Sequence, residues 1–309
     1  MIRGLSLLSL LTLLLVGATP YLSTTPTGSA QVVLPVEVIG SDGYIASTTV
    51  DLPSIGSADR LYLQVHRPVY RDIAINPGRG AKASVRLNGG PWVDLTEANV
   101  ECFAHEAAYG CLQSSYYTLR LTVDLGLFGS PGLQPGDNTL DFRFNGTDGI
   151  TSGYRILALN VLTGAGASLI PSSQFIEENP GTWQAPRPST ADIAAGAQAW
   201  STAELVESPQ AGAPLIRATC ASCHAPDGRD LKYFNYSNRS IEERAKFHGL
   251  SETEAEQIVS YIRSLDTPAP EDARPWNPPY QPGPGLDSRP AIEWAAGAGL
   301  EWVLEDDAD

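Results

Sequence analysis

The sequence predicts a multidomain α+β protein, with an N-terminal all-β sandwich or jelly roll, then an all-α domain and a proline-rich C-terminal extension. Three observations lead to this prediction. Apolar and polar residues alternate in short runs through residues 31–165, as half-buried strands require. Apolar residues recur at helical spacing within residues 191–267. Eight prolines then fall within residues 268–290, and so dense a run of proline is incompatible with a helix.

The first thirty residues are predicted to be a signal peptide. A short positive start at residues 1–4 precedes an apolar run at residues 5–16, which is too short to span a bilayer comfortably. Small residues allow cleavage after Ala18 or after Ala30, and the sequence leaves this choice open, together with the alternative of an uncleaved anchor. We therefore expect an exported protein, periplasmic or extracellular and bacterial, with no stable membrane span after cleavage.

The charge of the chain restricts its partners. The formal net charge is −15 at pH 7, and cleavage of the signal peptide removes the single charge of Arg3 and leaves −16. Such an acidic protein repels phosphate backbones, so nucleic acid is excluded as a partner. The expected partner is instead a redox protein with a basic docking face, and the β domain is a further surface for self-association or for carbohydrate.

The β domain is predicted over residues 31–165. Strand-like alternation and intervening turn signals give about eight strands, the arrangement of a sandwich or jelly roll. The clearest strand patterns lie at residues 61–65, 83–87, 119–123, 140–144 and 157–161. A linker rich in proline and glycine is expected at residues 166–190.

The helical region begins near residue 190, where Thr190 and Asp192 offer a cap to an alanine-rich helix at residues 194–205. Ser251 followed by Glu254 forms the capping-box pattern, and the helix that it starts is predicted to run until Pro268. Beyond it we expect an extended proline-rich segment. A short acidic helix around residues 291–304 then packs its tryptophans against the domain.

The four cysteines form two pairs of different kinds. Cys102 and Cys111 lie in a polar stretch, and in an exported protein they are expected to close a small disulfide loop. Cys220 and Cys223 belong to the pattern Cys220-Ala221-Ser222-Cys223-His224.

This pattern is the attachment motif of a c-type haem. Two thiols at this spacing bond to the two haem vinyl groups, and the adjacent His224 becomes the proximal ligand of the iron. A thioredoxin-like pair is disfavoured because no βαβ pattern surrounds it. A zinc site is disfavoured because it needs four ligands and no second cysteine pair lies nearby. One covalent haem c is therefore the predicted cofactor.

Residues 191–266 resemble a class I c-type cytochrome domain. The resemblance rests on the glycine-containing helix at residues 196–200, on residues 220–228, and on the closing helix at residues 250–265. It implies a small all-helical fold around the haem, with the first and last helices crossing beside it. It covers roughly a quarter of the chain and implies nothing about the β domain.

The distal ligand departs from that family, which usually supplies a methionine, because the only methionine in this chain is Met1. His248 lies just before the closing helix, so ligation by His224 and His248 is the first hypothesis. The alternatives are that His248 only caps a helix, that His66 or His105 reaches the iron, or that the iron is five-coordinate. If the chain is a fragment, a methionine beyond Asp309 is a further option.

Two functions compete, and a third is weaker. The first is electron transfer by an exported monohaem cytochrome, with the β domain used for docking or assembly and no catalytic residues. The second is a haem enzyme, or a sensor of gas or peroxide, with an open distal position. The third is carbohydrate binding by the β domain through Trp92, Tyr116 and Tyr117, for which core packing is the simpler explanation.

Overall fold

The computed structural model describes residues 31–66, 82–113, 118–147, 152–207, 209, 212–216, 218–232 and 236–266. The predicted signal peptide and the predicted proline-rich extension with its final helix lie outside these residues.

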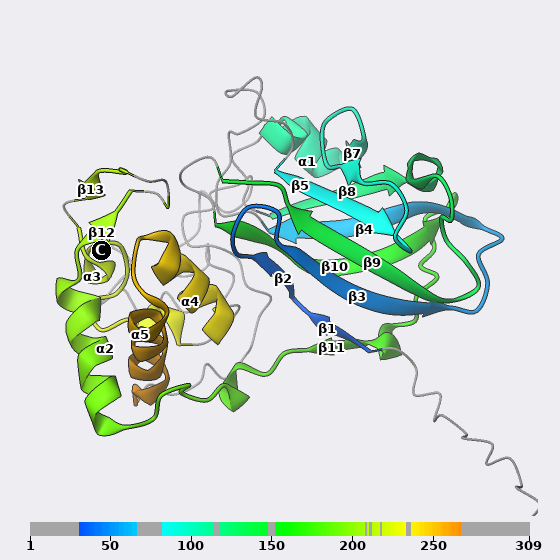
Figure 1. Ribbon diagram of the computed structural model, residues 1–309. Helices are drawn as coiled ribbons and strands as arrows, with labels where there is room; N and C mark the ends of the chain where they lie inside the picture. Colours follow the sequence, from blue (N-terminus) through cyan, green and yellow to red (C-terminus); the bar gives the residue numbers. More distant parts are fainter. Residues whose placement is uncertain are drawn as a thin grey trace, which may run out of the picture.

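Two antiparallel sheets form the N-terminal part (Figure 1). The first sheet has the strand order β2 (Val36–Ile39), β10 (Gly153–Thr163), β4 (Ala58–His66), β8 (Thr118–Asp124) and β7 (Val100–Cys102). The second has the order β3 (Ile45–Leu52), β9 (Gly136–Phe144), β5 (Ala83–Leu87) and β6 (Val93–Asp94). The chain passes repeatedly from one sheet to the other, so most neighbouring strands within a sheet are distant in sequence.

The core of this part lies between the sheets and follows from the period of two in a strand. On β4, Leu61 and Leu63 are fully buried, while Tyr62 between them is half-buried. On β9, Leu140 and Phe142 are fully buried in the same cluster. The side chains between the sheets are therefore apolar and tightly enclosed, as in a sandwich.

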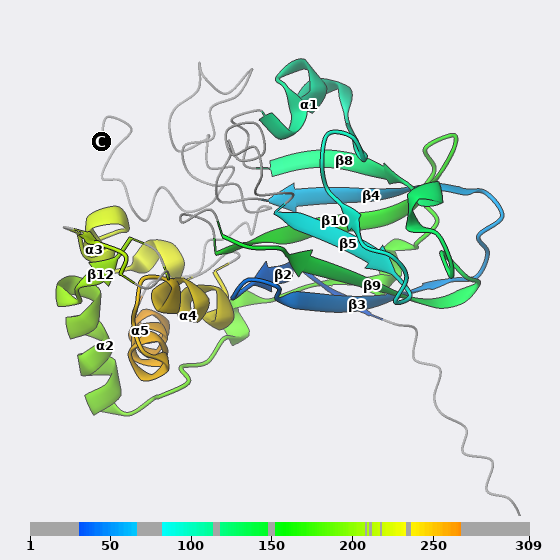
Figure 2. The ribbon, with the colours of Figure 1, turned by 45° about the horizontal axis from the view of Figure 1, so that its top comes forward.

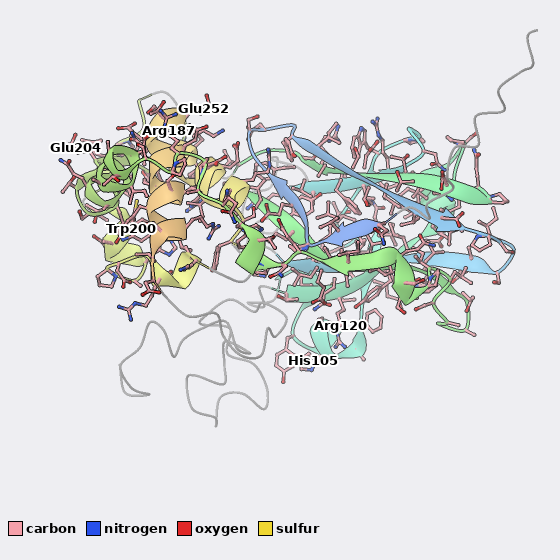
Figure 3. All side chains as sticks on the ribbon, turned by 90° about the horizontal axis from the view of Figure 1, so that it is seen from below. His105, Arg120, Arg187, Trp200, Glu204 and Glu252 are labelled. Atoms are coloured by element: carbon pink, nitrogen blue, oxygen red, sulfur yellow. A yellow bond between two sulfur atoms is a disulfide. The ribbon has the colours of Figure 1, made fainter. Side chains whose placement is uncertain are left out.

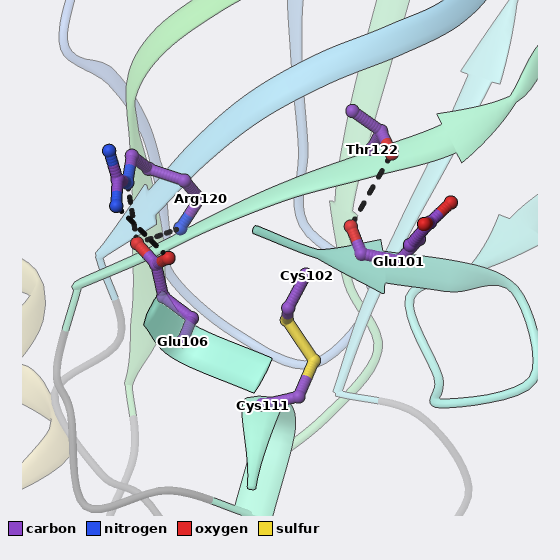
Figure 4. The surroundings of a disulfide bond; sticks show 6 residues. All are labelled: Glu101, Cys102, Glu106, Cys111, Arg120 and Thr122. Atoms are coloured by element: carbon purple, nitrogen blue, oxygen red, sulfur yellow. Dashed lines mark hydrogen bonds and ion pairs between the residues drawn. A yellow bond between two sulfur atoms is a disulfide. The ribbon is translucent and has the colours of Figure 1, made fainter. Parts of the chain in front are cut away.

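A short helix and a disulfide close one edge of the first sheet (Figure 4). Cys102 at the end of β7 is bonded to Cys111 at the start of the 3₁₀ turn η1 (Cys111–Gln113). Between them lies α1 (Ala104–Ala108). Its buried Glu106 accepts hydrogen bonds of 2.6 and 3.1 Å from the guanidinium of Arg120 on β8. The disulfide and this ion pair both tie the loop to the sheet.

The segment at residues 166–190 is partly structured. It contains the 3₁₀ turns η3 (Ser172–Gln174) and η4 (Pro180–Thr182), and between them β11 (Phe175–Glu177). Strand β11 pairs in parallel with β1 (Val32–Leu34). Buried Gln174 exchanges hydrogen bonds of 2.9 and 2.8 Å with the backbone of Asp51. This segment therefore runs along the β part, as Figure 2 also shows, before it reaches the helices.

The helical part lies beside one end of the sheets (Figure 1). Its elements are α2 (Thr190–Thr202), β12 (Leu205–Val206), β13 (Leu215–Ile216), α3 (Cys220–Cys223), the 3₁₀ turn η5 (Arg229–Leu231), α4 (Asn238–Phe247) and α5 (Glu252–Ser264). Helix α5 starts at the predicted capping box, in which Ser251 and Glu254 bond reciprocally. Helix α2 is capped by Ser189 and ends at Thr202, before the predicted Leu205.

Helices α2 and α5 cross in close contact at Gly196. A Cβ atom at this position would lie 2.0 Å from the Gln257 carbonyl oxygen and 3.0 Å from Cβ of Tyr261. Only glycine lets the two backbones approach this far. Trp200, one turn further along α2, is buried in the same core as Ile258 and Ile262 of α5.

The predicted fold class was wrong in its helical half. The described residues are 34% strand and 29% helix, and no all-α cytochrome domain is evident among them. Between α2 and α3 the chain forms the antiparallel pair β12–β13, with Leu205 opposite Ile216 and Val206 opposite Leu215. Branched residues favour this extended pairing. Helical periodicity on either side does not show it, because two strands of two residues carry almost no pattern.

Candidate functional site

Helix α3 consists of the first four residues of the cysteine motif, and His224 follows directly after it. It is a single turn, in which the backbone N–H of His224 donates to the carbonyl of Cys220 over 3.0 Å. The Ser222 hydroxyl accepts from the N–H of Thr219 at 3.1 Å and closes the turn. Cys220 is half-buried and packs with Ala221 against the helical core. Two intervening residues in one helical turn place both cysteine positions and His224 on one short segment.

His224 is held by Asp230. Its Nδ1 lies 2.7 Å from Oδ2 of Asp230, and the second oxygen of Asp230 accepts from the backbone N–H of Ala225 at 3.1 Å. The exposed fractions of the two side chains are 35% and 19%. A carboxylate only accepts hydrogen bonds, so the bonding proton sits on Nδ1. No described residue bonds to Nε2, so the lone pair of this nitrogen is available to bind a metal ion.

The loop that presents Asp230 is fixed by α2 and α5. The indole N–H of Trp200 donates to the carbonyl of Pro226 over 3.0 Å. Gly228 has φ of +75°, and a Cβ there would lie 2.2 Å from Cδ1 of Ile262. This left-handed turn against the core requires glycine, and it leads directly into η5, which contains Asp230. The crossing of α2 and α5 thus sets the position of Asp230, the hydrogen-bond partner of His224.

His248 lies at the C-terminal cap of α4 and is held in a similar way. Its Nδ1 lies 2.9 Å from the carbonyl oxygen of Val206 on β12, and the N–H of Val206 donates back to the His248 carbonyl over 3.0 Å. The carbonyl oxygen is an acceptor, so the proton again sits on Nδ1. No described residue bonds to its Nε2.

The electrostatic setting favours the neutral form of His248. Burial lowers its pKa most and the positive charge of Arg244 lowers it further, whereas the hydrogen bond to the Val206 carbonyl acts in the opposite direction. A neutral imidazole with its proton on Nδ1 offers the Nε2 lone pair, which is the form that ligates metals. The strand pair that contradicts the all-α prediction is thus also the element that orients His248.

The other predicted histidines belong to the β part. His66 is buried on β4, with Nδ1 3.2 Å from the Thr118 hydroxyl. His105 is on α1, where its ring stacks at a tilt against Tyr109, and Figure 3 shows it far from Trp200 of the helical part. The described residues contain no methionine, since Met1 lies outside them. Among the predicted ligands, the helical part therefore holds His224 and His248.

The predicted carbohydrate residues do not form a described site. Tyr116 and Tyr117 lie outside the described residues. Trp92 is half-buried, and the guanidinium groups of Arg86 and Arg143 lie 4.5 and 4.3 Å from its ring centre. Its ring is therefore used in contacts with these two arginine side chains.

Sequence reasoning missed Asp230 and Val206. Asp230 follows the attachment motif by six residues, in Asp227-Gly228-Arg229-Asp230. A carboxylate just after a glycine turn was the available signal for it. Val206 acts through its carbonyl oxygen, which any residue carries, so no side-chain pattern identifies it.

Comparisons with family models, with curated proteins and with solved structures gave no match. Within the described ranges, no three His, Cys, Asp or Glu side chains gather as a metal-ion site. The same ranges contain no helix of the length and hydrophobicity needed to cross a membrane. Function must therefore be argued from the site itself.

Proposed function

We propose that the chain is an exported, electron-transferring haem protein with one covalent haem c, attached through Cys220 and Cys223. The observation that carries the proposal is the motif Cys220-Ala221-Ser222-Cys223-His224, in which His224 has its Nδ1 bonded to Asp230 and its Nε2 without a partner among described residues. A histidine that binds haem iron through Nε2 donates its Nδ1–H to a hydrogen-bond acceptor, and this hydrogen bond fixes the orientation of the ring.

The residues fit this group on three counts. The two cysteines, separated by two residues and followed by a histidine, match the attachment pattern of a c-type haem. Two histidines, His224 and His248, each have Nδ1 on an oxygen acceptor. Apolar side chains such as Trp200, Leu205 and Ile216 belong to the cluster against which Cys220 and Ala221 pack, and their chemistry suits a porphyrin face. The bound group supplies one-electron redox chemistry, while the protein holds the ligands and limits access of water.

Electron transfer is favoured over catalysis by the state of His248. It is half-buried, oriented by Val206 and has a pKa lowered by burial, and these properties suit an axial ligand. Two histidine ligands leave no position for a substrate, so the role that remains is to accept one electron from a donor protein and to pass it to an acceptor.

The proposal is tested by producing the full chain in a host that attaches c-type haem. We expect one haem per chain that stays bound after denaturation, and one reversible one-electron step in a redox titration. The Cys220→Ala/Cys223→Ala variant should carry no covalent haem. Wild-type protein without covalent haem would overturn the proposal.

The net charge of −15 supports a basic partner. Opposite charges steer association, and salt screens them over about 8 Å at physiological ionic strength. Electron exchange measured by stopped flow with a basic redox protein should slow by about tenfold or more between low and high salt. An acidic redox protein of similar potential is the control. A rate to the basic protein that is independent of salt would contradict the docking model.

A further inference from the structure

The Asp230 carboxylate makes two hydrogen bonds at the cysteine motif. Both oxygens of Asp230 face the motif, one on Nδ1 of His224 at 2.7 Å and one on the N–H of Ala225 at 3.1 Å. These two hydrogen bonds hold the carboxylate of Asp230 on η5 against the ring of His224, and only 19% of the Asp230 side chain is exposed.

The neighbouring cation is directed away from Asp230. Arg229 instead pairs with Asp227, with contacts of 2.7 and 2.9 Å to its carboxylate. This pairing lowers the pKa of Asp227 and raises that of Arg229. Among the described residues, no Lys or Arg side chain pairs with Asp230, so its negative charge acts on the neutral His224 ring without compensation.

The two histidines therefore differ in the strength of their anchors. His248 bonds to a neutral carbonyl oxygen, that of Val206, whereas His224 bonds to a carboxylate. A charged acceptor makes a shorter and roughly twice as strong hydrogen bond, and it increases the electron donation of the ring to a metal on the other nitrogen. Donation and negative charge both stabilise an iron in the higher oxidation state.

We propose that Asp230 is a positioning residue that acts through His224 to lower the reduction potential of the haem. The inference rests on the proposed function, because it requires iron on Nε2 of His224. A haem at this site then has a low reduction potential, which suits a strongly reducing electron donor. Asp230 is the side chain that lowers this potential.

The test measures midpoint potentials of wild type, Asp230→Asn, Asp230→Glu and Asp227→Asn by redox titration. Loss of a hydrogen-bond partner of a metal-bound histidine typically changes metal affinity or activity by about 10–100-fold. A change of the same order in the relative affinity for ferric and ferrous iron means that Asp230→Asn should shift the ferric–ferrous equilibrium at least about tenfold toward ferrous, or about 59 mV upward. Asp230→Glu should restore most of the wild-type value. Asp227→Asn removes the same charge without touching His224 and should shift the potential much less.

A second measurement needs no substitution at Asp230. In the ferrous His248→Ala protein, the iron–His224 stretching frequency from resonance Raman should be high, as for an imidazole bonded to a carboxylate. A frequency typical of an imidazole bonded to a neutral carbonyl would overturn the inference. Equal potential shifts in Asp230→Asn and Asp227→Asn would also overturn it while leaving the covalent haem intact. Absence of covalent haem from wild type would instead remove the proposed function.

Discussion

The two parts of the molecule complete their cores differently. Among the described residues, 25 buried apolar side chains fill the space between the two β sheets, whereas the helical cluster contains ten. The phenylalanines Phe128, Phe142 and Phe144 are fully enclosed in the β part, but the helical part leaves Cys220 and His224 half-buried beside Trp200. Small units with few buried residues usually need a staple such as a cofactor. The comparison predicts that the helical part depends on a bound group for its stability more than the β part does.

The largest effect is expected from removal of the proposed haem attachment. In Cys220→Ala/Cys223→Ala, the helical part should lose the stabilisation of a tightly bound group. That stabilisation is about 4 kcal/mol for a ligand at about 1,000 times its dissociation constant. For a unit of this size the unfolding midpoint falls by roughly 15 °C or more.

Circular dichroism at 222 nm should therefore show an early helical transition in this variant, well before the β part unfolds. Cys102→Ala/Cys111→Ala, which removes the disulfide of the β part, is the matched control and should leave the helical transition in place. A haem-free variant that unfolds at the wild-type midpoint would contradict the difference between the two parts.

The next effect concerns the junction between the parts. Glu37 of β2 and Arg155 of β10 lie 3.4 Å apart with side chains 9% and 7% exposed, and Ser237 and Ser240 of the helical part bond to Glu37 and Arg155, respectively. Burial raises the pKa of Glu37, while Arg155 and Ser237 oppose that shift. Arg155→Ala leaves this acid buried without its partner, which should cost about 3–5 kcal/mol in denaturant unfolding.

The paired replacement Glu37→Gln/Arg155→Met removes both charges together. It should recover most of that loss, because the unpaired buried charge is the main penalty. If the double variant is as unstable as Arg155→Ala, the junction depends on packing and not on charge.

A smaller effect is expected at the crossing of α2 and α5. Gly196→Ala places a methyl group 2.0 Å from the Gln257 carbonyl oxygen, and overpacking of this kind costs about 1–3 kcal/mol. Gly56→Ala in the β part is the control, because a Cβ there meets nothing within 4 Å. Urea titration should show a lower midpoint for the helical transition in Gly196→Ala alone, and equal midpoints would rule out a close crossing.

The smallest effect is on acid stability. The pKa of Asp192 is lowered from 3.8 to about 2 by hydrogen bonds from Gln257 of α5 and from Ser189, and by Arg187. A lowered folded pKa stabilises the protein above the ordinary value, and this contribution is lost as the pH falls from about 3.8 through about 2. Asp192→Asn should flatten the pH dependence of helical unfolding in that window. A profile that is unchanged by the substitution would count against the α2–α5 link.

The β strands and the α5 capping box were within reach of the sequence, because period-two alternation and the pair Ser251–Glu254 are local signals. The same holds for the pairing of Cys102 with Cys111. The β12–β13 pair was not predictable, since two strands of two residues each carry almost no sequence pattern. In the site, the motif identified Cys220, Cys223 and His224 as candidates. The partners Asp230 and Val206 emerged only from the turn at Gly228 and from a backbone carbonyl.

The central claim is that the helical part holds a haem between His224 and His248. Absorption spectra of the ferrous full-length protein, with and without carbon monoxide, test it most directly. We expect a low-spin spectrum that carbon monoxide does not change, and a high-spin, carbon-monoxide-binding spectrum for His248→Ala. A wild-type spectrum that is high-spin and shifts with carbon monoxide would contradict the claim and would indicate an open iron.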